Sequence, residues 1–108
     1  MTKLLFVCSR NQWRSPTAEA VWRAEPGVQA RSAGTSSSAR RRVSLADLEW
    51  ADFVFVMENK HREILRRNFS EFDGEIHVLG ITDDYRFMDE ELVEMIYDLV
   101  VPIVGEPS

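Results

Sequence analysis

Alternating strand and helix patterns predict an α/β fold, a three-layer domain with a parallel sheet and helices on both faces. Three short apolar runs bounded by polar residues are typical of strands buried on both faces. They cover residues 4–7, 53–57 and, more weakly, 76–79. Segments with helical spacing lie between and after these runs. In such sheets, ligands bind where strands end and helices begin.

Four helices are expected, over residues 16–23, 45–50, 60 to about 69, and 89 to about 101. The first has a strong start signal because Ser15 precedes Pro16, which is favoured in the first helical turn. Residues 35–42 are rich in Ser and Arg and are expected to form a loop.

Length and composition predict one folded domain over residues 1–108. A chain of 108 residues with 44% hydrophobic residues has enough apolar side chains for one ordinary core. No apolar run approaches the roughly 18 residues that a membrane helix needs, and the N-terminus lacks the pattern of an export signal. We therefore expect a soluble, cytoplasmic protein with no membrane partner.

Charge and cysteine content exclude several classes of site. The net charge of -5 argues against nucleic-acid binding, but residues 1–42 carry +6 and residues 43–108 carry -11. A basic N-terminal part indicates either an anion site or an unevenly charged solvated surface. Cys8 is the only cysteine, which excludes an internal disulfide and a Cys-rich zinc site. We expect no metal and no cofactor, and the oligomeric state stays open.

The segment from Cys8 to Pro16 places the only thiol at the end of a strand, a short loop before a helix. Backbone N–H groups in such a loop bind anions, and the helix N-terminus favours a thiolate. The planar guanidinium of Arg14 matches two phosphate oxygens. Asn11 tolerates the left-handed backbone of a tight loop. Together these features predict a phosphate site with a nucleophilic cysteine.

Residues 6–20 (FVCSRNQWRSPTAEA) resemble the phosphate-loop signature of the low-molecular-weight protein tyrosine phosphatases. The resemblance continues in order through residues 32–35, 53–58 and 81–85. It implies a four-stranded parallel sheet with helices on both faces, in agreement with the α/β fold predicted above, and a phosphate loop after the first strand. The chain is shorter than typical members, between residues 34 and 43 and before residue 81.

The resemblance implies hydrolysis of a phosphate monoester in two steps, on a phosphotyrosine protein or peptide. Cys8 would form a cysteinyl-phosphate intermediate, Arg14 would bind the phosphoryl oxygens, and Asp83 would act as general acid and base. The loop would also hold phosphate or other oxyanions. The expected substrate-binding residues are Ser9, Arg10, Asn11, Gln12, Trp13, Ser15 and Tyr85.

Within that set, the resemblance gives some residues particular roles. Ser15 would donate a hydrogen bond to the sulfur, and Asn11 with Ser32 would hold the loop in shape. Tyr85 would wall the pocket and stack on the phosphotyrosine ring. His61 and His77 are expected at surface or strand positions without a role.

Three positions depart from the family pattern. Arg10 stands where the family usually has Gly, and Trp13 replaces a second loop cysteine. Asp84 replaces the Pro that normally follows the acid, so that either Asp83 or Asp84 could be the general acid. Two alternative functions remain open: a phosphate-binding module without turnover, and an arsenate reductase-like enzyme that uses external thiols.

Overall fold

The computed structural model describes residues 1–105; residues 106–108 of the expected domain lie outside the described residues. Strands and helices follow one another along the chain. In order they are β1 (Thr2–Cys8), α1 (Arg14–Arg23), β2 (Val28–Gly34), α2 (Leu45–Trp50), β3 (Phe53–Val56), α3 (Asn59–Asn68), β4 (Ile76–Val78) and α4 (Glu90–Val104).

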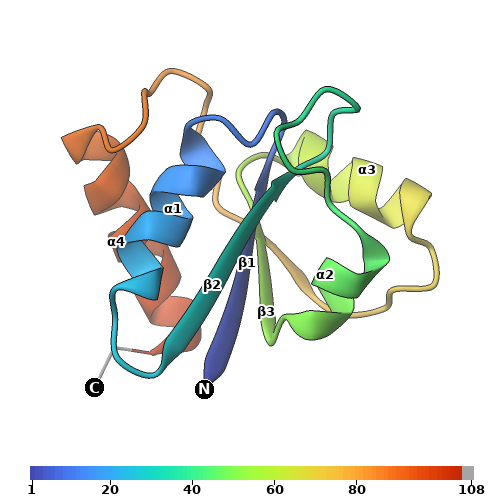
Figure 1. Ribbon diagram of the computed structural model, residues 1–108, viewed down its shortest axis with the longest axis horizontal. Coiled ribbons are helices and arrows are strands. Elements are labelled where there is room, and N and C mark those ends of the chain that lie inside the picture. Colours follow the sequence, from blue (N-terminus) through green and yellow to red (C-terminus); the bar gives the residue numbers. More distant parts are fainter. Residues whose placement is uncertain (106–108) are drawn as a thin grey trace.

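The four strands form one parallel sheet in the order β2-β1-β3-β4, which confirms the predicted fold class. Helices α1 and α4 lie on one side of the sheet and α2 and α3 on the other (Figure 1). Within residues 1–105, no helix combines the length and apolar character needed to cross a bilayer.

Alternation along β1 produces two cores, because successive side chains of a strand point to opposite faces. Leu4 and Phe6 pack with Trp22 of α1 and with Leu92, Ile96 and Val100 of α4. Leu5 and Val7 face the other way and pack with Leu48 of α2 and Leu65 of α3. Burial on both faces explains the continuous apolar run at residues 4–7.

The order of the strands creates a binding position at the carboxyl end of β1. The chain leaves β1 for β2 on one side and later returns to β3 on the other, which opens a crevice at that end of the sheet. The segments after β1 and β2 and the segment before α4 all lie at this end (Figure 1). The sheet therefore brings residues 8–14, 35–42 and 81–89 together.

The structure corrects three boundaries. Helix α1 begins at Arg14 with Trp13 at its N-cap, so Pro16 lies within the first turn and does not start the helix. Strand β2 begins at Val28, although only its end was expected, because this edge strand carries the polar residues Gln29 and Arg31 and lacks a continuous apolar run. Helix α4 runs to Val104 through Pro102, beyond the expected end near residue 101.

Candidate active site

Backbone hydrogen bonds determine the orientation of the loop between β1 and α1. Three successive loop carbonyls accept from the segment after β2: Cys8 from Thr35 N–H (2.9 Å), Ser9 from Ser36 N–H (2.8 Å) and Arg10 from Arg40 N–H (3.1 Å). Because N–H and C=O of a trans peptide point in opposite directions, the amides that follow these carbonyls face the other side. Outside the helices and strands of residues 1–105, no backbone hydrogen bond is donated by residues 10–13. These N–H groups are free to bind an anion.

Asn11 connects the loop to two neighbouring elements through its side chain. Its backbone is left-handed, with φ of 54°, and its side chain is buried. The amide nitrogen donates to the hydroxyls of Ser15 and Ser32, both at 2.9 Å. Ser32 in turn donates to Glu19 at 2.6 Å. The loop is thus fastened to both α1 and β2.

The Cys8 sulfur lies 3.0 Å from the hydroxyl oxygen of Ser15, and Cys8 as a whole is 3% exposed. Asn11 donates to that oxygen, so the hydroxyl hydrogen of Ser15 points away from Asn11. It has two acceptors within reach, the sulfur and the carbonyl of Ala33 at 3.3 Å. Ser15 is therefore placed to donate to a thiolate.

Arg14 is buried, and only part of its guanidinium is used by the protein. Nη1 donates to the Glu58 carboxylate and to the carbonyl of Ile81 at 2.8 Å. Among residues 1–105, the buried Nε has no hydrogen-bond partner, and the Asp83 carboxylate lies 3.5 Å away in a geometry too poor for a hydrogen bond. Since Glu58 and Ile81 fix the guanidinium, a fixed donor remains for an anion.

Cys8 and Arg14 line one small pocket of about 90 Å³. The other lining residues are Ser9, Arg10, Gln12, Trp13 and Asp83. The structure therefore brings together seven of the ten residues expected at the site. Asn11 and Ser15 are buried and do not line this pocket, and a hydrogen bond joins their side chains.

Asp83 and Asp84 have different surroundings. Asp83 lines the pocket with a side chain that is 58% exposed. Asp84 accepts a hydrogen bond from the hydroxyl of Thr82 at 2.5 Å and does not line the pocket. The geometry favours Asp83 as the carboxylate that reaches a substrate.

Tyr85, expected to wall the pocket, is not among the residues that line it. It packs partly against the α1/α4 core, and its hydroxyl lies 3.5 Å from Glu91. Desolvation and the charge of Glu91 raise the pKa of Tyr85. The aromatic residue in the pocket wall is Trp13, with the Arg86 guanidinium 5.6 Å from its ring centre.

His61 contacts the site, although a surface or strand position without a role was expected. It is fully buried on α3, with Nε2 2.8 Å from the Ser9 hydroxyl and Nδ1 accepting from the backbone N–H of Glu58 at 3.0 Å. Burial, reinforced by the charge of Arg14, lowers the pKa of His61 to about 4. The sequence signal was a Glu-x-x-His at the start of the helix after β3, a spacing typical of reciprocal capping.

Glu58 links His61 to Arg14. Burial acts to raise the pKa of Glu58, but the hydrogen bond and charge of Arg14 outweigh it, and the pKa is lowered. Glu58 is therefore an anion that anchors the guanidinium. Among the described residues, no cluster of three His, Cys, Asp or Glu side chains could hold a metal ion.

Solved structures with the same architecture are numerous. The low molecular weight protein tyrosine phosphatase SP-PTP of Streptococcus pyogenes superposes with a TM-score of 0.78 at 18% identity, over 98% of this chain and 95% of that one. Wzb of Vibrio vulnificus, solved with benzylphosphonate, gives a TM-score of 0.71 at 25% identity, over 92% and 91%. The chain has the low-molecular-weight protein tyrosine phosphatase fold.

The same fold includes the YwlE arginine phosphatase of Geobacillus stearothermophilus, with a TM-score of 0.70 at 21% identity, over 92% of this chain and 86% of that one. No protein-family model and no curated protein sequence matches the chain. The resemblance to the low-molecular-weight phosphatases is thus confirmed in the fold, with the phosphate loop after β1.

Proposed function

We propose that this protein is a phosphate monoester hydrolase, a protein tyrosine phosphatase that acts through a cysteinyl-phosphate intermediate. One observation carries the proposal: the Cys8 thiol and the Arg14 guanidinium, whose Nε is without a hydrogen-bond partner, line the same small pocket. A nucleophile and a fixed cation beside free loop amides are what phosphoryl transfer requires.

In the first step, the Cys8 thiolate attacks phosphorus, an S–P bond forms and the ester P–O bond breaks. Asp83 gives its proton to the departing oxygen. Arg14 and the loop amides stabilise the charge on the phosphoryl oxygens. Ser15, at 3.0 Å from the sulfur, stabilises the thiolate as nucleophile and as leaving group.

In the second step, water attacks phosphorus and the S–P bond breaks. The Asp83 carboxylate takes a proton from that water, so the carboxylic acid and the thiolate are both restored. Asp83 suits this role because it lines the pocket and is still half-exposed to water.

The position of Trp13 favours a substrate with an aromatic ring. Its indole is part of the pocket wall, and stacking on an aryl phosphate ring is worth about 0.5–1.5 kcal/mol beyond area burial. Because a YwlE protein of this fold is described as an arginine phosphatase, phosphoarginine is the natural competing substrate. Matched phosphotyrosine and phosphoarginine peptides distinguish the two, and we expect the higher kcat/KM for phosphotyrosine.

Hydrolysis of para-nitrophenyl phosphate by the wild type, Cys8→Ala and Arg14→Lys proteins tests the proposal. We expect turnover by the wild type, none by Cys8→Ala, and a large loss in Arg14→Lys, because an ammonium group cannot replace the planar guanidinium. Saturable phosphate binding without turnover by the wild type would instead indicate a binding module. Arsenate reduction dependent on an external thiol would indicate the reductase.

A further inference from the structure

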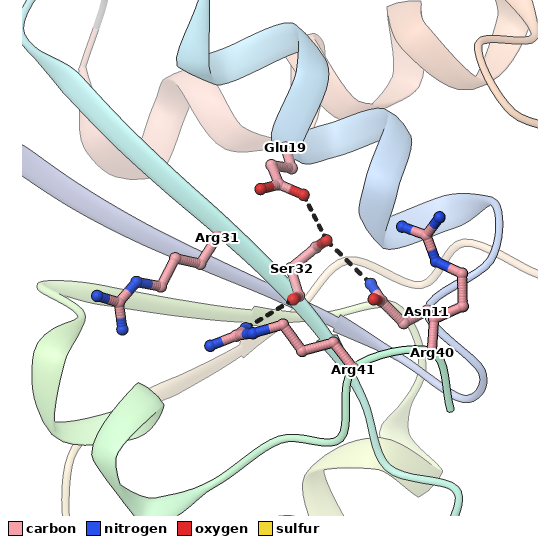
Figure 2. A pocket seen from close by; sticks show the side chains of 6 residues that line it. All are labelled: Asn11, Glu19, Arg31, Ser32, Arg40 and Arg41. Carbon is pink, nitrogen blue, oxygen red and sulfur yellow. Dashed lines mark hydrogen bonds between the residues drawn. The ribbon is translucent and has the colours of Figure 1, made fainter. Parts of the chain in front are cut away.

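A hollow beside the phosphate loop is rich in arginine. We call this hollow, which has a volume of about 830 Å³, the arginine groove. Its lining residues are Asn11, Glu19, Arg31, Ser32, Arg40 and Arg41 (Figure 2). None of the proposed chemical steps uses its three arginines.

The groove lies at the edge of the sheet, because Arg31 and Ser32 belong to the edge strand β2. Figure 2 shows Ser32 of β2 at its centre, bonded to Glu19 of α1 and to Asn11 of the phosphate loop. Arg41 covers the strand edge by donating to the Ser32 carbonyl at 2.8 Å. The groove thus adjoins the residues that hold the loop.

Positive charge in the groove exceeds what the protein itself neutralises. Arg31 and Arg41 share the single carboxylate of Asp47, which is buried beneath them. Glu19 also lines the groove; it accepts a hydrogen bond from the neutral Ser32 hydroxyl and keeps its negative charge, so that three arginines face two carboxylates. Within residues 1–105, the exposed side chain of Arg40 forms no hydrogen bond or ion pair.

Shared lining residues connect the groove to the catalytic pocket. A further hollow, called the middle hollow, shares the lining residue Gln12 with the catalytic pocket. Arg40 and Glu19 line both the middle hollow and the arginine groove. The middle hollow adds Arg23, and the catalytic pocket adds Arg10 at its rim. A chain lying along this path passes one cation after another.

We propose that the arginine groove binds acidic residues of a phosphorylated polypeptide whose phosphoryl group occupies the Cys8 pocket. The inference rests on the proposed function and adds a preference for Asp and Glu near the phosphorylated residue. Continuity with the pocket and the volume of the groove favour an extended segment over a single small ion. Complementary charge at an exposed surface raises association and affinity at low salt.

The three consecutive arginines provide a matched set of variants. Arg40 is the cleanest probe, since its backbone N–H holds the loop while its side chain is free. Arg42 is the control, because it lines a different hollow with Ile64 and Phe69. Arg41 is unsuitable, since its removal would leave buried Asp47 with one cation fewer.

The kinetic experiment compares two phosphotyrosine peptides that differ only in flanking Glu or Gln residues. For the wild type at low salt, we expect kcat/KM about three- to tenfold higher for the Glu peptide, from a few exposed ion pairs. The difference should lie mainly in KM and shrink at high salt. Arg40→Glu should bring the ratio to one or below, whereas Arg42→Glu should keep it. Equal values for both peptides in the wild type would overturn the inference.

A binding experiment separates this inference from the proposed function. In the Cys8→Ala protein, fluorescence anisotropy gives the Kd of both peptides without turnover. We expect tighter binding of the Glu peptide, and loss of that preference in the Cys8→Ala, Arg40→Glu double variant. Equal Kd values would refute the binding of acidic residues in the arginine groove, even if the wild type hydrolyses both peptides. A clear preference without any wild-type turnover would refute the catalytic proposal alone.

Discussion

The Nε2 atom of His61 lies 2.8 Å from the hydroxyl oxygen of Ser9, in the wall of the catalytic pocket. Because Nδ1 accepts from the Glu58 N–H, a neutral imidazole carries its hydrogen on Nε2 and donates to Ser9. The hydroxyl of Ser9 then has its own hydrogen available for another acceptor. This relationship ties α3 to the phosphate loop and leaves the Ser9 hydroxyl able to donate to an oxyanion in the proposed reaction.

Protonation of His61 should destabilise the folded state. The pKa of His61 is lowered to about 4 from 6.5, so the unfolded chain binds the proton first as the pH falls. The free energy of unfolding should therefore decrease between about pH 6.5 and 4, by about 3 kcal/mol in total from this group. Urea denaturation as a function of pH measures the decrease.

His61→Gln should abolish the decrease in unfolding free energy that His61 causes between about pH 6.5 and 4, because Gln does not titrate. The Gln side chain still offers an N–H donor to Ser9. His77→Gln is the control for the loss of one imidazole. An unchanged pH dependence in His61→Gln would contradict the buried, neutral state of His61.

Replacement of Asn11 should separate its backbone role from its hydrogen bonds. Asn11→Gly removes both side-chain hydrogen bonds but tolerates the positive φ, whereas Asn11→Ala removes the same bonds and keeps a Cβ in the left-handed region. We expect Asn11→Ala to be less stable than Asn11→Gly by about 1–2 kcal/mol, and both to lose activity because Ser15 is no longer held. Equal stability of the two variants, measured by urea denaturation, would show that the left-handed backbone is not required.

Gly34→Ala should damage the contact between β2 and the phosphate loop. A Cβ at residue 34 would lie 2.6 Å from the Ser9 carbonyl oxygen and 2.6 Å from the Cβ of Ala39. We expect a loss of about 1–3 kcal/mol in unfolding free energy, the usual cost of overpacking. Adding Ala39→Gly should restore only part of it, since the carbonyl remains. A fully stable Gly34→Ala protein would contradict this packing.

Asp83→Asn should slow esters with poor leaving groups far more than activated aryl esters, since only a basic leaving oxygen needs a proton. The expected loss for alkyl-like esters is about 10²–10⁴-fold, and kinetics over a leaving-group series measures it. Asp84→Asn should be milder because Asp84 is bonded to Thr82 and lies outside the pocket lining. The reverse order would make Asp84 the acid.

The sequence was sufficient for the fold class because the runs at residues 4–7 and 53–57 are buried on both faces and therefore continuously apolar. It was insufficient for the start of β2, because this edge strand carries polar residues such as Arg31 and Ser32, which line the arginine groove, and has no continuous apolar run. A local motif located Cys8, Asn11 and Arg14.

No local pattern could reveal the position of Tyr85, which depends on how the segment before α4 packs. His61 lies 52 residues from Ser9 in the chain, and only the β1–β3 pairing brings them together.

The most direct test of the account is rapid acid quenching of the reaction with para-nitrophenyl phosphate, followed by peptide mass spectrometry. We expect one phosphoryl group on the sulfur of Cys8 during turnover, with greater accumulation in Asp83→Asn, because dephosphorylation then lacks its general base. Turnover without a phosphorylated Cys8 at any quench time, or turnover that persists in Cys8→Ala, would contradict the covalent mechanism.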